Sequence, residues 1–140
     1  MKRVAVFALV LVGACARTMP DHDNRIFTAP VAAKLTVGDL VGAFSADAAA
    51  AADRFAGRAV EISGVARNLP AAGQPATLTL NASTPATGAE GAAPATVPAS
   101  LHEDRATEVL KTLADGQRAT LKCFCEVTGS TVRLKSCVVP

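Results

Sequence analysis

The sequence predicts a mainly β fold with helices, in which a helix is followed by three strands, a second helix and two strands. Two kinds of periodicity support this prediction. Short runs that alternate apolar and polar residues recur from position 59 onward, as in strands that bury one face. Two longer runs space their apolar residues as the buried face of a helix does. Gly, Pro, Asn and Asp separate the runs and indicate turns.

The first residues of the chain predict export and lipid attachment. Lys2 and Arg3 precede an apolar run that is too short to span a membrane, as in a secretory signal peptide. The run ends in Val12-Gly13-Ala14-Cys15, which resembles the lipobox of bacterial lipoproteins. That resemblance implies cleavage after residues 1–14 and lipid on the sulfur and the new amino group of Cys15.

Residues 15–34 are predicted to be a flexible tether, and the folded domain is expected to occupy residues 35–140. The tether segment is polar, lacks periodicity and contains prolines. In Gram-negative lipoproteins, the absence of Asp after the lipidated Cys implies the outer membrane, on its periplasmic face, and Ala16 stands there. His22 lies between two Asp residues, but short-range ligands on a flexible segment bind metals weakly, so we expect no metal site.

A helix is predicted from Thr36 to Gly57. Thr36 and Asp39 have the spacing of a capping box, and Gly57 is placed to end the helix. The expected buried face recurs at helical spacing and consists of Leu40, Phe44, Ala48, Ala51 and Phe55.

Three strands are predicted to follow, over residues 59–67, 77–80 and 97–101. Gly64 inside the first strand indicates a bend or a bulge. Pro98 in the third strand favours an edge position, because proline cannot donate to a ladder. The segment 83–96 is rich in Ala, Pro, Thr and Gly and is predicted to be a mobile loop.

The second helix is predicted over residues 104–113, ended by Asp115-Gly116. Two further strands are expected over residues 118–127 and 132–139. A two-residue turn joins them, with Gly129 at a position that favours a type II′ turn.

Five strands with a helix between the third and the fourth are the order of an OB-fold barrel. A set of residues agrees in order and spacing with one known family: Leu40, Phe44, Asp47 and the segments 54–58, 60–64, 110–117 and 132–137. Through them the chain resembles the tRNA-anti-like OB-fold family, which includes small bacterial lipoproteins, over about residues 35–139. The resemblance implies a five-stranded OB-fold-like barrel with an N-terminal helix. The family name implies nucleic-acid binding by analogy of fold only.

With Cys15 assigned to lipid, Cys123, Cys125 and Cys137 are left for an oxidising compartment, where one disulfide and one free thiol are the simplest outcome. The family resemblance implies a bond between Cys125 and Cys137. The pleat opposes that bond: counting from the two-residue turn places Cys137 opposite Lys122, on the other face from Cys125. A bond therefore requires a β-bulge that changes the parity of one strand.

Lys122, Phe124, Arg133 and Lys135 are predicted to share the outward face of the last two strands, where they form a candidate binding face. Glu126 lies on the same face and weakens its positive charge. An ordinary solvated strand surface has the same composition.

Charge and aromatic content argue against a nucleic-acid partner. Loss of Lys2 and Arg3 with the signal peptide leaves twelve basic and twelve acidic residues, so no positive surplus remains to displace counterions from phosphates. Trp and Tyr are absent, and we expect Phe44 and Phe55 to be buried, which leaves too few rings for base stacking.

Together these observations predict a non-enzymatic envelope lipoprotein, attached to the membrane through Cys15, whose domain binds a protein or a small ligand. No cofactor is expected. No catalytic motif is present, and His102 is the single His of the predicted domain. One alternative is a nucleic-acid-binding OB module. Another is a thiol redox or copper protein that uses Cys123-Phe124-Cys125, because thiolates suit Cu(I).

Overall fold

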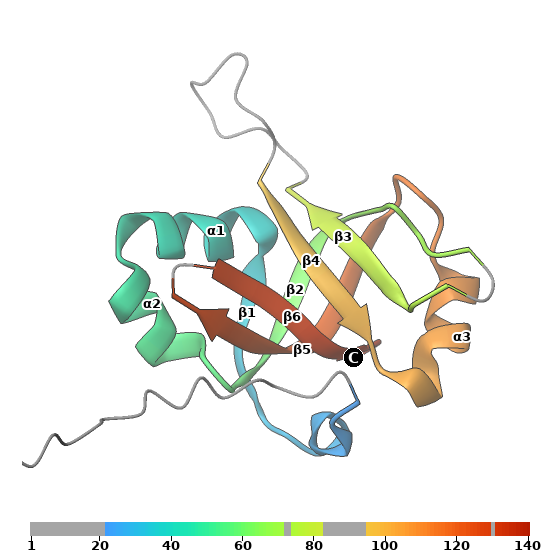
Figure 1. The fold of residues 1–140 in the computed structure, drawn as a ribbon, viewed down its shortest axis with the longest axis horizontal. Coiled ribbons are helices and arrows are strands. Elements are labelled where there is room, and N and C mark those ends of the chain that lie inside the picture. The colour runs from blue at the N-terminus through green and yellow to red at the C-terminus, as the bar shows by residue number, and fades with distance from the viewer. Residues whose placement is uncertain (1–21, 72–73, 83–94, 130) are drawn as a thin grey trace, which may run out of the picture.

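A computed structural model describes residues 22–71, 74–82, 95–129 and 131–140. Its centre is a closed barrel in which neighbouring strands follow the order β2-β3-β4-β6-β5, and β5 pairs back with β2 (Figure 1). These strands are β2 (Ala59–Arg67), β3 (Thr77–Asn81), β4 (Thr96–Leu101), β5 (Arg118–Thr128) and β6 (Thr131–Val138). Helix α3 (Glu103–Thr112) lies between β4 and β5 in the chain. The predicted OB-fold barrel is confirmed.

The predicted first helix is two helices, α1 (Val37–Ala46) and α2 (Ala48–Phe55). They are separated at Asp47, whose backbone is extended and whose carboxylate accepts a 3.1 Å hydrogen bond from the Ala50 N–H. A short acidic side chain in this position caps a new helix instead of continuing the old one. The start of α1 is as predicted: the Asp39 N–H donates to Thr36 Oγ1, and Asp39 Oδ2 accepts from the Thr36 N–H.

Strand β2 changes neighbours along one edge. Residues 59–63 pair there in parallel with the additional strand β1 (Val31–Thr36), and residues 65–67 pair with β3. The other edge pairs with β5 from Ala59 to Val65 without a register shift. The change of neighbour falls at Gly64, where the sequence predicted a bend or a bulge. A Cβ at Gly64 would lie 2.7 Å from Val37 Cγ2 and 2.8 Å from the Asn81 carbonyl oxygen. Only glycine fits where the helix and the next strand approach so closely.

Residues 22–34 are part of the folded domain, so the predicted tether is wrong over this stretch. The 3-10 helix η1 (Asn24–Phe27) and strand β1 pack on the barrel, and Ile26 is fully buried beside Ala59, Phe124 and Val138. The Asp23 N–H donates to Ser136 Oγ at 2.8 Å. Ile26 is the single fully buried large apolar side chain of residues 22–34, which is too few to produce the periodicity that indicates a buried element.

Pro98 is not on an edge strand of the sheet, because β4 lies between β3 and β6. The first partners of β4 and β6 are Ala99 and Leu134, one residue after the proline. At Pro98 the β6 side of the strand is therefore open, which explains why the missing N–H is tolerated. Of the predicted loop 83–96, residues 83–94 lie outside the described part of the structure.

The barrel interior holds one continuous apolar core. Helix α3 places Val109 against it, and α1 and α2 contribute Leu40, Phe44 and Phe55. In Figure 1, α1 and α2 lie at one end of the barrel and α3 lies at the other. No helix in the described ranges has the length and apolar character that crossing a bilayer requires.

Candidate functional site

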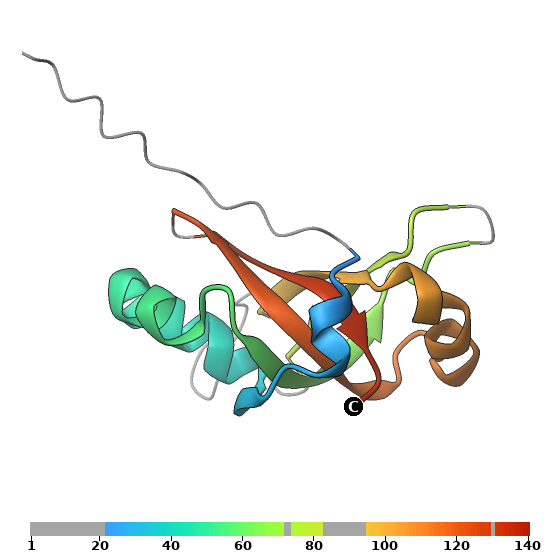
Figure 2. The same ribbon diagram turned by 90° about the horizontal axis from the view of Figure 1, so that it is seen from below.

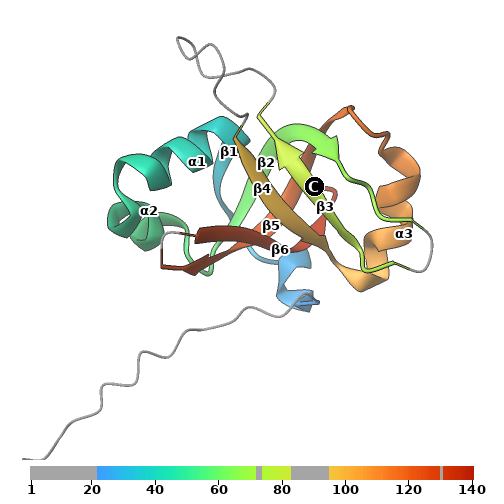
Figure 3. The ribbon, with the colours of Figure 1, turned by 45° about the horizontal axis from the view of Figure 1, so that its top comes forward.

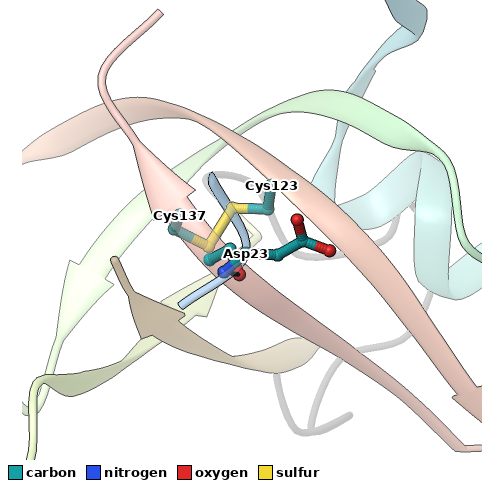
Figure 4. Close-up of a disulfide and its surroundings, with 4 residues drawn as sticks. Asp23, Cys123 and Cys137 are labelled. Atoms are coloured by element: carbon teal, nitrogen blue, oxygen red, sulfur yellow. Dashed lines mark hydrogen bonds between the residues drawn. A yellow bond between two sulfur atoms is a disulfide. The ribbon is translucent and has the colours of Figure 1, made fainter. Parts of the chain in front are cut away.

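The disulfide joins Cys123 of β5 to Cys137 of β6 (Figure 4). The predicted pair Cys125 and Cys137 is therefore wrong, although the predicted outcome of one disulfide and one free thiol holds for the described residues. The bond is inside the barrel, where both cysteines are fully buried. It joins β5 to the last residues of β6, the two strands on which the predicted binding face lies.

A β-bulge explains this pairing. Lys122 pairs with Val138, and Phe124 pairs with Lys135, so the single residue Cys123 faces two residues of β6. The extra residue is Ser136, whose φ of 54° lies in the left-handed region. One inserted residue changes the parity of β6 and turns Cys137 inward. The sequence indicated that any bond to Cys137 requires a bulge, but it did not indicate where the bulge lies.

Cys125 stays reduced and is fully buried opposite Leu134. Burial in an apolar environment raises the pKa of its thiol to about 12, because the thiolate would lose its hydration. The alternative prediction of a copper or redox site needs two thiolates from Cys123 and Cys125. The structure contradicts it, since one sulfur is in a disulfide and the other is a buried thiol.

The predicted binding face on the outside of β5 and β6 is not an exposed aromatic and basic patch. Phe124 is only 4% exposed because η1 covers it, and the Arg25 guanidinium lies 5.8 Å from the centre of its ring. The basic residues also face acidic ones across the strands. Lys122 pairs in register with Glu61, and Arg133 with Glu126, while Lys135 lies opposite Phe124.

The segment around η1, which covers Phe124, contains an ion pair between Arg25 and Asp23 that the sequence analysis did not anticipate. Arg25 Nε donates to both carboxylate oxygens of Asp23 at 3.0 Å. The Asp23 side chain is nearly buried, whereas that of Arg25 is exposed. The hydrogen bonds from Arg25 hold the pKa of the Asp23 carboxyl below its usual value.

His102 has a structural position at the start of α3. Its Nδ1 accepts a 3.2 Å hydrogen bond from the Asp104 N–H and so caps the helix. The other ring nitrogen, Nε2, lies 3.0 Å from Asn24 Oδ1, which makes it the N–H donor of the neutral ring. Glu103 and Asp104 lie in the first turn, where the helix dipole favours them, as predicted.

The strongest candidate site is a groove between α1 and the beginnings of β4 and β6. OB-folds bind their ligands on the second and third barrel strands and the adjoining loops, which here are β3, β4 and the turn between β5 and β6. Figure 3 shows β4 between α1 and β3. The groove has a volume of about 580 Å³, and its described lining carries no charge. It is lined by Val41, Phe44, Ser45, Thr96, Pro98, Thr131 and Val132.

Beside the groove, the outward face of β3 and β4 is polar and uncharged. Cross-strand partners on this face are Thr77 with Ser100 and Thr79 with Pro98. No aromatic side chain belongs to it. Phe44, at the floor of the groove, is buried and tilted against Phe55. The described residues of the groove and of this face include no Lys or Arg to neutralise a phosphate chain, so they suit a neutral ligand better.

A closed five-stranded barrel with a helix before its fourth strand defines an OB-fold protein. Residues 3–138 match the tRNA_anti-like family, and the chain belongs to that family. Its fold is similar to that of a lipoprotein from Klebsiella pneumoniae subsp. pneumoniae, which is named as a candidate nucleic acid-binding protein. The two chains are 12% identical, with a TM-score of 0.55 over 84% of this chain and 97% of that one. No curated protein matches the sequence.

Proposed function

We propose that this protein is a non-enzymatic envelope lipoprotein, anchored through lipid on Cys15, whose OB-fold domain binds a protein segment or a small uncharged ligand in the groove beside α1. The observation that carries the proposal is the uncharged lining of that groove, on the surface that OB-folds use for recognition. The outer membrane, on its periplasmic face, is the proposed location.

The disulfide supports an extracytoplasmic location. Structural disulfides persist in oxidising compartments such as the periplasm and are rare in the reducing cytosol. The bond between Cys123 and Cys137 is buried, away from solvent reductants. The similar Klebsiella chain is also named a lipoprotein. Cys15 itself lies outside the described residues, so its acylation is part of the proposal.

The engagement of His102 supports a binding role without catalysis. A general base must reach a substrate proton, and both ring nitrogens of His102 are already occupied inside the protein. The groove offers hydroxyl groups from Ser45, Thr96 and Thr131, with no charged group beside them in its described lining to act as a base.

Site-specific photocrosslinking in the native envelope tests the groove. A photoreactive side chain at Thr96 should form one dominant adduct, identified by mass spectrometry. The matched control is the same side chain at Asp53, which is exposed on α2 outside the groove. A groove-filling Ser45→Trp substitution should reduce the Thr96 adduct several-fold. Equal adducts from both positions, or a Thr96 adduct that Ser45→Trp leaves unchanged, would contradict the groove as the binding site.

The name of the Klebsiella protein favours one rival, a nucleic-acid-binding module. Such a module needs cationic contacts to phosphates and, for single strands, stacking rings. A gel shift with single-stranded DNA or tRNA at increasing salt separates the two functions. Binding that falls steeply with salt concentration would support the rival and overturn the proposal.

A further inference from the structure

The exposed large apolar side chains of the described residues lie together at one place, next to where the chain leaves for its proposed anchor. They are Phe27, 42% exposed, at the end of η1, and Val139, 54% exposed, just after β6. Both line a cavity of about 380 Å³ that is separate from the groove beside α1. Figure 2 shows η1 and the C-terminus on the same side of the barrel.

Side chains from three elements form this surface. Phe27 packs edge-on against the His102 ring, with 4.9 Å between ring centres, and the Arg105 guanidinium of α3 lies 5.6 Å from the Phe27 ring. Val109 of α3 forms part of the cavity wall. The Phe27 ring is therefore held in place with one side open. We call the two exposed apolar side chains, Phe27 and Val139, together with Arg105 beside the Phe27 ring, the apolar rim.

The proposed lipid on Cys15 would keep the apolar rim close to a bilayer. Six residues, 16–21, lie between the lipidated Cys15 and His22, and the seven residue steps from one to the other span at most about 25 Å at full extension. η1 begins two residues after His22. This end of the domain therefore stays within a short distance of the membrane, whereas α1 lies on the far side of the barrel (Figures 1 and 3). A short tether gives a weak surface contact a high effective concentration.

The charges beside the apolar rim are paired with each other. Arg25 is bound to Asp23, and Arg105 Nη1 donates to Glu108 Oε2 at 3.1 Å. His22 also lies near Glu103. A surface of this kind does not depend on anionic headgroups for attraction. Its contact with a bilayer comes from apolar side chains at the level of the headgroups, where amphipathic groups are stable.

We propose that the apolar rim rests on the surface of the bilayer that holds the lipid anchor, with Phe27 and Val139 inserted among the headgroups. This inference depends on the proposed acylation of Cys15. It fixes the orientation of the domain: η1 and the end of β6 face the membrane, and the groove beside α1 faces away from it. A ligand or partner would then approach the groove from the periplasmic space.

The absence of tryptophan from the chain makes the test direct, because one introduced tryptophan is the only such fluorophore. The full lipidated protein, as Phe27→Trp, is reconstituted into phosphatidylcholine vesicles with and without brominated acyl chains. Bromine should quench its indole several-fold more strongly than the indole of the matched Gly42→Trp variant. Gly42 is exposed on α1, and no atom lies within 4 Å of a Cβ built there. Adding salt should leave the quenching of the Phe27→Trp protein unchanged.

Mass spectrometry of the same samples separates the possible failures. An unacylated Cys15 would refute the proposed anchor. Acylated protein with equal quenching at positions 27 and 42 would overturn the membrane-facing rim and leave the anchor intact. Emission from the Phe27→Trp protein that depends on protein concentration but not on bromine would overturn the membrane contact too, because a second copy of the chain would then cover the rim. As a further check, Val139→Asp in the Phe27→Trp protein should lower the quenching, while Asp53→Asn should not.

Discussion

Single residues decide which cysteines of this barrel can pair. Ser136 adds one residue to β6, so Cys137 faces inward and meets Cys123 instead of Cys125. The sequence showed that a bulge was required, since the pleat alone places Cys137 on the wrong face. It could not show the place of the bulge, because Ser136 has neither the flexibility of glycine nor another signal for a left-handed backbone.

Reduction of the disulfide should lower the free energy of unfolding by about 3 kcal/mol. In the chain-entropy argument, a bond that closes a loop of this length removes about that much from the unfolded state. Urea unfolding with and without a strong reductant measures the difference. Cys125→Ala should retain the full effect of the reductant, whereas Cys137→Ala should lose it. If the reductant has no effect on Cys125→Ala, the disulfide involves Cys125, and the pair Cys123 and Cys137 is wrong.

Gly64→Ala should destabilise the domain by roughly 1–3 kcal/mol, since the new methyl group would overlap Val37 and the Asn81 carbonyl. The matched substitution Gly42→Ala lies in α1, where a Cβ meets open space, and should stabilise the domain by about 0.5–1 kcal/mol. Thermal or urea unfolding of both variants measures these opposite signs. Two changes of the same sign would contradict the close approach of α1 and β3 at Gly64.

At the scale of elements, the predictable parts are those with a strong local pattern. Strand β2 occupies the predicted residues 59–67, and β5 and β6 agree with prediction to within one residue. Strand β1 was missed because its sequence, Val31–Thr36, has small residues and only partial burial. η1 was missed because Ile26 is its single buried apolar side chain, and its other contacts with the barrel are polar or aromatic contacts to distant residues such as Ser136 and His102. Both gain their stability from the barrel surface, which a local pattern does not contain.

The local structure of η1 should depend on acid through the Asp23 carboxylate, which caps η1 and pairs with Arg25. The folded pKa of this carboxyl is lower than the unfolded value of about 3.9, chiefly because Arg25 donates hydrogen bonds to it. The stabilisation is therefore present above about pH 4 and is lost as the pH falls through the folded pKa. Urea unfolding between pH 2 and pH 7 should show a steeper loss of stability in the wild type than in Asp23→Asn.

Asp23→Asn keeps a side-chain oxygen that can cap η1, so the comparison isolates the charge. Asp53→Asn, on the exposed surface of α2, is the matched control and should follow the wild-type profile. If Asp23→Asn and the wild type have parallel profiles down to pH 2, the ion pair between Asp23 and Arg25 contributes nothing to the stability of the domain.

At the scale of the whole molecule, the candidate site could not be read from the sequence. The groove takes residues from α1, from β4 and from β6, which only the closed barrel brings together. The face that the sequence favoured is an outer wall of the barrel, and η1 covers its one ring, Phe124. Barrel closure and the covering segment are both long-range features, so strand periodicity could identify the outward face but not its accessibility.

Cys15→Ser should separate the anchor from the fold. Cys15 lies seven residues before the described part of the structure, so the substitution removes the acceptor of the lipid without touching the barrel. We expect the variant to lose the mass of the acyl groups and to leave the membrane fraction. Its disulfide should still form between Cys123 and Cys137, and its unfolding midpoint should be unchanged. Cell fractionation, intact mass and urea unfolding measure these three properties.

The matched control is Cys125→Ser, which replaces a buried thiol and leaves the anchor in place. It should stay acylated and membrane-bound while its unfolding midpoint falls, because a polar hydroxyl enters the apolar core. Cys15→Ser is thus expected to change the membrane attachment and not the stability, and Cys125→Ser the stability and not the attachment. If the intact mass shows that residues 1–14 are removed, membrane association that survives Cys15→Ser would mean that the domain itself contacts the bilayer. The apolar rim formed by Phe27, Val139 and Arg105 would be the first candidate for that contact.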